Sequence, residues 1–152
     1  MGTAPQVLHS LEELKVFAHS FIHQWSNGAK VALLGELGAG KTAFVRACID
    51  VLAEAASITN PRVMSPTYVV HQSYPELVRT VEHFDLYRMQ GVTAEALVEI
   101  GFWESVDRAQ AAGGFIFVEW ADRLEESLVD FDVALRFSVS NEGQHEVDFS
   151  TL

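Results

Sequence analysis

The 152-residue sequence has little cysteine and no long apolar run. Its single cysteine, Cys48, has no partner for an internal disulfide, which favours a reducing, cytoplasmic setting. No apolar run approaches the roughly 20 residues that a membrane-spanning helix needs. Residues 1–6 show neither the cationic nor the apolar stretch of a secretory signal. We therefore expect a cytoplasmic protein that does not enter a membrane.

Basic residues are also scarce. The sequence has 10 Lys and Arg against 21 Asp and Glu, which gives a formal net charge of −11. Proteins that bind nucleic acids or anionic membranes tightly neutralise phosphates with clustered cations. This chain has too few cations for that, so we expect no direct tight binding of nucleic acid and no binding to membranes.

Apolar residues, in contrast, are plentiful. They make up 49% of the sequence, and only 20% of the residues are charged. Such a chain can bury enough apolar surface to offset the entropy that folding costs. Its length is the usual size of one domain, so we expect residues 1–152 to fold as a single domain.

Hydrophobic periodicity and turn signals predict alternating helices and strands. Ser10 and Glu13 have the spacing of a capping box at a helix start. Residues 31–34 and 115–118 are short apolar runs next to glycines, a pattern typical of strands that are buried on both faces. Helices are predicted at 11–25, at 41–55 and, as two short segments broken near Gly101, at 93–112. Further strands are predicted at 68–74, 80–84, 133–139 and 146–150.

A glycine-rich motif lies between the strand at 31–34 and the helix at 41–55. Residues 35–42 read GELGAGKT and match G-x-x-x-x-G-K-[ST] in full. In such a loop successive backbone N–H groups face a phosphate, and the helix that follows adds its positive end. We expect Lys41 to reach the β- and γ-phosphates and the Thr42 hydroxyl to bind Mg²⁺. The candidate nucleotide-binding residues are Gly35, Glu36, Leu37, Gly38, Ala39, Gly40, Lys41, Thr42 and Ala43.

The motif and the order of elements predict an α/β P-loop NTPase fold. We expect a largely parallel central sheet, helices on both faces and a C-terminal antiparallel hairpin. The two apolar runs, 31–34 and 115–118, are predicted to be adjacent central strands.

Two carboxylates stand at predicted strand ends. Glu119 follows the run 115–118, and Asp85 follows the strand at 80–84. In a parallel sheet both would lie beside the phosphate loop, where they could hold Mg²⁺ or place the attacking water. Position alone equally allows solvated strand ends, or a helix cap in the case of Asp85. His83, two residues before Asp85, is interpreted as a hydrogen-bonded strand residue.

Four segments together resemble the bacterial TsaE (YjeE) family, P-loop ATPases of tRNA threonylcarbamoyladenosine biosynthesis. They are GELGAGKTAFVRA at 35–47, SPTYVV at 65–70, HFDLYR at 83–88 and VEW at 118–120. The glycine loop occurs in many families, whereas the other three in this order are specific. Many members carry proline where Ala121 stands, which affects the local turn alone.

The resemblance implies an ATPase that works with the partners TsaB and TsaD. It implies ATP and Mg²⁺ as cofactors, Lys41, Asp85 and Glu119 as catalytic residues, and Thr42, Asp85 and Glu119 as the metal-binding residues. Residues 65–68 resemble the mobile segment of the family, and Trp120 resembles the aromatic residue that follows its glutamate.

Other functions for the same loop remain open. A small-molecule kinase would transfer the γ-phosphate, but it usually needs several arginines over the phosphates, and no cationic lid is evident here. A GTP-dependent switch would carry the pattern N-K-x-D, which the sequence lacks. A nucleotide-binding subunit that never hydrolyses is the remaining alternative. The sequence leaves open which of Asp85 and Glu119 contacts the metal.

Overall fold

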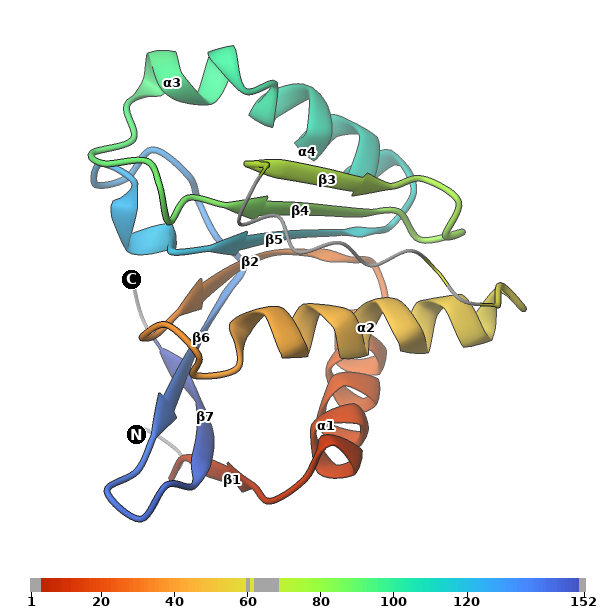
Figure 1. The fold of residues 1–152 in the computed structure, drawn as a ribbon. Coiled ribbons are helices and arrows are strands. Elements are labelled where there is room, and N and C mark those ends of the chain that lie inside the picture. Colours follow the sequence, from red (N-terminus) through yellow and green to blue (C-terminus); the bar gives the residue numbers. More distant parts are fainter. Residues whose placement is uncertain (1–3, 60, 62–68, 151–152) are drawn as a thin grey trace.

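The computed structural model describes residues 4–59, 61 and 69–150, which form a seven-stranded sheet with helices packed against it (Figure 1). The strands are β1 (Gln6–Leu8), β2 (Ala29–Leu34), β3 (His71–Tyr74), β4 (Val81–Asp85), β5 (Phe115–Glu119), β6 (Val133–Val139) and β7 (His145–Ser150). The helices are α1 (Leu11–Gln24), α2 (Lys41–Ala55), α3 (Ala94–Glu99), α4 (Phe102–Ala111) and the short 3-10 helix η2 (Ala121–Arg123).

The centre of the sheet is parallel. The strand order is β1-β7-β6-β2-β5-β4-β3, in which β6, β2, β5 and β4 run in the same direction. The two edges are antiparallel, because β7 pairs with β6 and β1, and β3 pairs with β4. The expected largely parallel centre and the C-terminal hairpin are thus confirmed. The two apolar runs are adjacent strands, as predicted, with Val31 opposite Phe117.

Helices cover both faces of the sheet, as the sequence predicted (Figure 1). Because side chains alternate along a strand, β2 sends Val31 and Leu33 toward α1 and α2, and Ala32 and Leu34 toward α3 and α4. Two separate apolar clusters therefore hold the helices, one on each face. At 25 cal/mol per Å² of buried apolar area, each large apolar side chain contributes about 1.5–3 kcal/mol to this packing.

Aromatic packing fixes the first turns of α2. The ring of Phe44 is fully buried, and its centroid lies 5.3 Å from that of Phe21, 5.9 Å from that of Phe117 and 5.5 Å from that of Phe137. The beginning of α2 is thereby held at the carboxyl ends of the parallel strands, where the glycine loop enters the helix.

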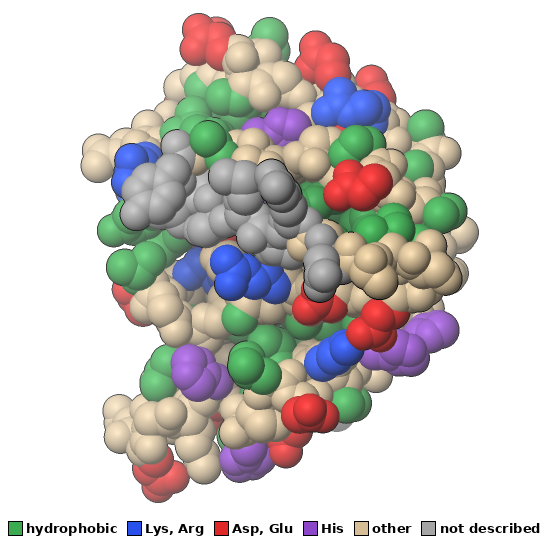
Figure 2. Space-filling model, turned by 45° about the vertical axis from the view of Figure 1, so that its right-hand side comes forward, with side chains coloured by type: hydrophobic (Ala, Val, Ile, Leu, Met, Phe, Trp, Pro, Cys, Tyr) green, Lys and Arg blue, Asp and Glu red, His purple; other side chains and the backbone are tan. Residues whose placement is uncertain are grey.

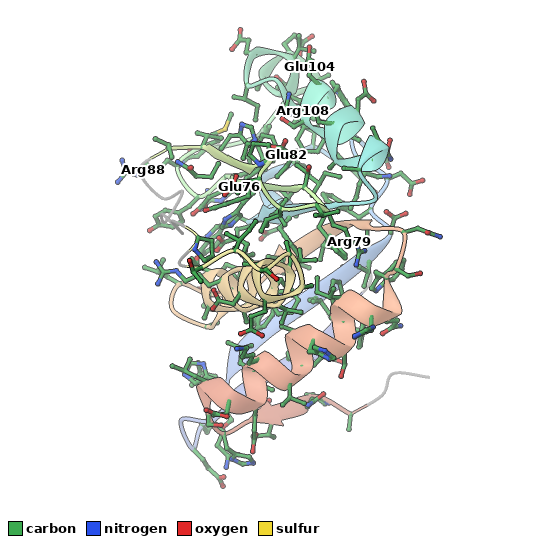
Figure 3. The ribbon with its side chains drawn as sticks, turned by 90° about the vertical axis from the view of Figure 1, so that its right-hand side faces the viewer. Glu76, Arg79, Glu82, Arg88, Glu104 and Arg108 are labelled. Atoms are coloured by element: carbon green, nitrogen blue, oxygen red, sulfur yellow. The ribbon has the colours of Figure 1, made fainter. Side chains whose placement is uncertain are left out.

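The face toward α4 carries a polar network as well as apolar contacts. Glu82 of β4 is fully buried and accepts a hydrogen bond of 3.0 Å from Arg108 Nε on α4, and the two side chains meet in Figure 3. Ser73 and His71 of the edge strand β3 contact the same carboxylate. The network therefore joins the sheet edge to α4.

The element boundaries agree with the sequence except in a few places. Tyr68, the first residue of one predicted strand, lies outside the described residues, and β3 begins at His71. The strand β1 was not predicted, because three residues carry too little pattern and its partner, β7, is distant in the sequence. Within the described part of the chain, every helix is too short or too polar to cross a membrane.

Candidate nucleotide-binding site

The glycine-rich motif forms the loop between β2 and α2. Gly35, Gly38 and Gly40 have φ values of 133°, 78° and 124°, a region that side-chain-bearing residues rarely adopt. A Cβ on Gly35 would also lie 2.1 Å from the carbonyl oxygen of Phe137. The tight course of the loop along β6 therefore requires glycine at this position.

The N-terminus of α2 has no capping side chain among the described residues. Its N-cap is Gly40, and its first turn contains no acidic residue. In contrast, α1 and α3 are capped by the hydroxyls of Ser10 and Thr93. The first N–H groups of a helix need a partner, and together they carry a partial positive charge. The start of α2 is thus suited to an anion such as phosphate.

Lys41 lies across its own loop. Its side chain is buried, and Nζ donates hydrogen bonds of 2.6 and 2.9 Å to the carbonyl oxygens of Gly35 and Glu36. Nζ also lies 4.3 Å from the centroid of the Trp120 ring. Burial lowers the pKa of Lys41, although Glu119 and Asp85 partly offset this effect. An arriving phosphate would favour the charged ammonium here.

The two strand-end carboxylates come together beside the loop. Asp85 and Glu119 are opposite each other in the register of β4 and β5, and both are buried. The Thr42 hydroxyl donates to Glu119, with distances of 2.8 and 3.0 Å to the two carboxylate oxygens. Asp85 Oδ1 accepts a hydrogen bond of 2.9 Å from the backbone N–H of Tyr87. Neither carboxylate is a solvated strand end.

These residues border one pocket of about 200 Å³. Its lining consists of Leu37, Gly38, Gly40, Lys41, Thr42, Ala43, Asp85, Tyr87, Glu119 and Trp120. Of the predicted nucleotide-binding residues, Gly35, Glu36 and Ala39 lie outside this lining; the carbonyls of the first two bind Lys41. Ala39 is buried, and its carbonyl lies 3.1 Å from His145 Nδ1.

The sequence predicted no site role for His83 and Tyr87, which contact residues that line the pocket. His83 Nε2 lies 2.6 Å from Glu119 Oε2, so His83 is the hydrogen-bonded strand residue that was predicted, but its partner belongs to the site. The ring of Tyr87 lies 5.0 Å from that of Trp120. The alternation of side chains could have revealed His83, because it shares a strand face with Asp85.

Two sequence expectations concern the borders of the site. Residues 65–68 lie outside the described residues. Trp120 adopts a left-handed conformation with φ of 59°, and its ring packs at the pocket beside Lys41. The turn continues directly into η2, which begins at Ala121.

The parallel sheet, the glycine loop and the open helix start define a P-loop protein of the nucleotide-binding class. The family model "Threonylcarbamoyl adenosine biosynthesis protein TsaE" matches residues 8–147. The chain therefore belongs to the TsaE family, which acts in the biosynthesis of threonylcarbamoyladenosine in tRNA.

Individual relatives agree with this assignment. The chain is 30% identical to the tRNA threonylcarbamoyladenosine biosynthesis protein TsaE of Rickettsia felis over 91% of this chain and 74% of that protein. It is 28% identical to the TsaE protein of Bacillus subtilis over 93% and 81% of the two chains. The crystal structure of Bacillus subtilis YdiB superposes with a TM-score of 0.64 at 25% identity, covering 98% of this chain and 86% of that one.

Proposed function

We propose that the chain is a Mg²⁺-dependent ATPase that drives an assembly of TsaB- and TsaD-like proteins in tRNA threonylcarbamoyladenosine modification. The observation that carries this proposal is the convergence of Lys41, Thr42, Asp85 and Glu119 at the uncapped start of α2. All four residues line the same pocket. Lys41 supplies a positive charge for phosphates, and the other three supply oxygen ligands for a metal ion. This combination suits binding and hydrolysis of a nucleoside triphosphate.

In this proposal the loop holds the phosphates. The N–H groups at the start of α2, which no side chain of the described residues caps, bind phosphate oxygens, and Lys41 exchanges the carbonyls of Gly35 and Glu36 for the β- and γ-phosphates. Because Lys41 is already directed along the loop, little side-chain entropy remains to be lost when the nucleotide binds.

The donor set beside Lys41 fits Mg²⁺. Thr42 supplies a hydroxyl, and Asp85 and Glu119 supply carboxylates, the hard oxygen ligands that this ion prefers. The Thr42 hydroxyl gives its hydrogen to Glu119, which leaves its oxygen lone pairs available for a cation. When bound, the ion would neutralise charge on the phosphates. Among the described residues no three His, Cys, Asp or Glu side chains form a metal-holding group, so phosphate and water oxygens would complete the coordination.

The carboxylates also suit the placement of water. Glu119 is our choice for this role, because it ends the most apolar strand, where an unneeded carboxylate would be costly. In that role Glu119 would orient the water that attacks the γ-phosphate, and Asp85 would bind the metal ion.

We propose further that the chain alone hydrolyses ATP slowly. A cation aimed at the transition-state charge, such as an arginine finger, accelerates phosphoryl transfer by roughly 10³–10⁵. Arg46 and Arg88 are exposed, and Arg123 lies over the rings of Tyr87 and Trp120 instead. The chain has a formal net charge of −11, and Figure 2 shows acidic side chains scattered among the other side chains of one face, so a basic partner would be attracted electrostatically.

The proposal is tested by phosphate release from ATP and GTP, with and without TsaB and TsaD, at two salt concentrations. We expect slow turnover alone, faster turnover with partners, and weaker stimulation at higher salt. Phosphate released into solution, and not transferred to a small molecule, would exclude the kinase. An unchanged rate under saturating partners would reject partner activation.

Calorimetry tests the phosphate loop itself. Lys41→Ala removes two charge-assisted hydrogen bonds to phosphate and should weaken ATP binding about 100-fold or more. Thr42→Ala should mainly reduce the gain in ATP affinity that Mg²⁺ provides. Thr42→Ser keeps the hydroxyl and should keep that gain. Normal ATP binding by the Lys41 variant would show that the loop does not hold phosphates.

A further inference from the structure

His83 contacts Glu119 from the interior of the sheet. It lies in the middle of β4, is 1% exposed, and its Nε2 is 2.6 Å from Glu119 Oε2. The register explains the contact: His83 is opposite Phe117, and Glu119 is two residues further along β5 on the same face. The pair is therefore built into the pairing of two central strands.

The carboxylate of Glu119 is held from two directions. The Thr42 hydroxyl approaches both of its oxygens from α2, and His83 approaches Oε2 from β4. In the proposed function Glu119 acts as a carboxylate, which can only accept a hydrogen bond, so the proton of the contact is assigned to Nε2 of His83. In the proposed function Thr42 also binds the nucleotide's metal ion. The hydrogen bond from His83 to Glu119 would then stay the same whether or not a nucleotide is bound.

The other nitrogen of His83 shows that this arrangement has a cost. Nδ1 is buried and has no hydrogen-bond partner among the described residues. A buried polar atom without a partner is unfavourable, and a phenylalanine ring would fill a similar space without this penalty. Packing alone therefore does not account for histidine at this position.

We propose that His83 is the positioning residue of Glu119. It fixes the orientation of the carboxylate that places the attacking water, and so it supports turnover and not nucleotide affinity. This inference rests on the proposed ATPase function. A purely structural histidine would affect stability and leave the turnover of folded protein unchanged.

Two substitutions at His83 separate these roles. His83→Phe keeps the ring and removes the donor, whereas His83→Gln replaces the ring with an amide whose N–H can reach a similar position. With the partner assembly present, His83→Phe should lower kcat about 10- to 100-fold, the usual loss when the hydrogen-bond partner of a site ligand is removed. KM should be unchanged, as should the calorimetric affinity for ATP without Mg²⁺. His83→Gln should recover most of kcat.

Ser105→Ala is the matched control. Ser105 is also buried, donates a hydrogen bond to the carbonyl of Gly101 and lies on α4, across the sheet from the pocket. It should change Tm without changing kcat. Wild-type kcat in His83→Phe would overturn the proposal, and so would equal losses in His83→Phe and His83→Gln, because the donor would then not matter.

A spectroscopic measurement decides the case even if His83→Phe does not fold. Long-range ¹H–¹⁵N spectra of the wild-type chain should show the imidazole proton on Nε2. Glu119→Gln should shift this resonance but not those of His19, an exposed residue of α1. A proton on Nδ1 with a bare Nε2 would overturn the proposal. If the wild-type assembly shows no turnover, the ATPase function fails, and the spectra still test whether His83 holds Glu119.

Discussion

Two buried glutamates on neighbouring strands differ in their surroundings. Glu82 of β4 is fully buried, and Glu119 of β5 is 2% exposed. Alternation along the strands turns them to opposite faces: Glu82 lies toward α4, and Glu119 lies toward α2 and the glycine loop.

The difference lies in the partners. Glu82 contacts His71, Ser73 and the guanidinium of Arg108. Burial alone would raise the pKa of Glu82, but these hydrogen bonds outweigh burial and hold the pKa below its usual value. In the described part of the chain, Glu119 forms no ion pair with Lys or Arg and contacts Thr42 and His83. Glu82 is thus paired with a guanidinium of the protein, whereas Glu119 is held by two hydrogen-bonding side chains and lines the pocket.

The largest expected effect is on turnover at Glu119. Glu119→Gln keeps the shape of the side chain and removes its charge, so kcat for ATP should fall by about 10²–10⁴, the usual contribution of a group that handles a reacting proton. Affinity for ATP should be largely retained, because in the proposed function the loop holds the phosphates. Asp85→Asn should also lower kcat, because in the proposed function Asp85 binds the metal ion.

Steady-state phosphate release and calorimetry check this prediction on the same samples. Glu82→Gln is the control, because it removes an equally buried charge on the other face. Wild-type turnover in both Glu119→Gln and Asp85→Asn would reject their catalytic roles.

The next effect is on stability at Glu82. Removing one member of a buried ion pair costs about 3–5 kcal/mol when a charge is left uncompensated. Arg108 is half exposed and can turn to water, so Glu82→Gln should cost about 2 kcal/mol, less than a fully buried pair. Denaturant unfolding measures this loss, and kcat of the folded variant should stay near the wild-type value. A stable but inactive Glu82→Gln would remove the distinction between the two glutamates.

The sequence predicted most of the fold because its signals are local. The helix at 41–55 begins and ends where α2 does, since the glycine loop marks its start and apolar residues recur through its length. The central strands followed from continuous apolar runs. In contrast, β1 depends on pairing with β7, more than 130 residues away, and no local pattern carries that information.

The candidate site was predictable to the extent that residues stand at strand ends or in the loop. Asp85 and Glu119 were placed together because parallel strands end at one edge of the sheet. The contact of His83 with Glu119 depends on register, which the sequence does not encode locally. Likewise, β4 has the sequence VEHFD, with three titratable residues in five positions: Glu82, His83 and Asp85. Only tertiary packing determines which of them faces α4.

The smallest expected effect is the pH dependence of stability at Glu82. Because its pKa is lower in the folded chain than in the unfolded one, its ionised form stabilises the fold. This contribution is fully present above the pKa of an unfolded glutamate, near 4.3, and is lost as pH falls through the folded pKa. His71 and Arg108 face the carboxylate, and their hydrogen bonds favour its ionised form. Unfolding of the wild type and of Glu82→Gln, measured at steps from pH 6 to pH 3, should therefore give a stability difference that is constant at first and shrinks below about pH 4.3. A difference that stays constant to pH 3 would mean that Glu82 stabilises the chain through shape and hydrogen bonding alone, and the comparison with Glu119 would then not rest on charge.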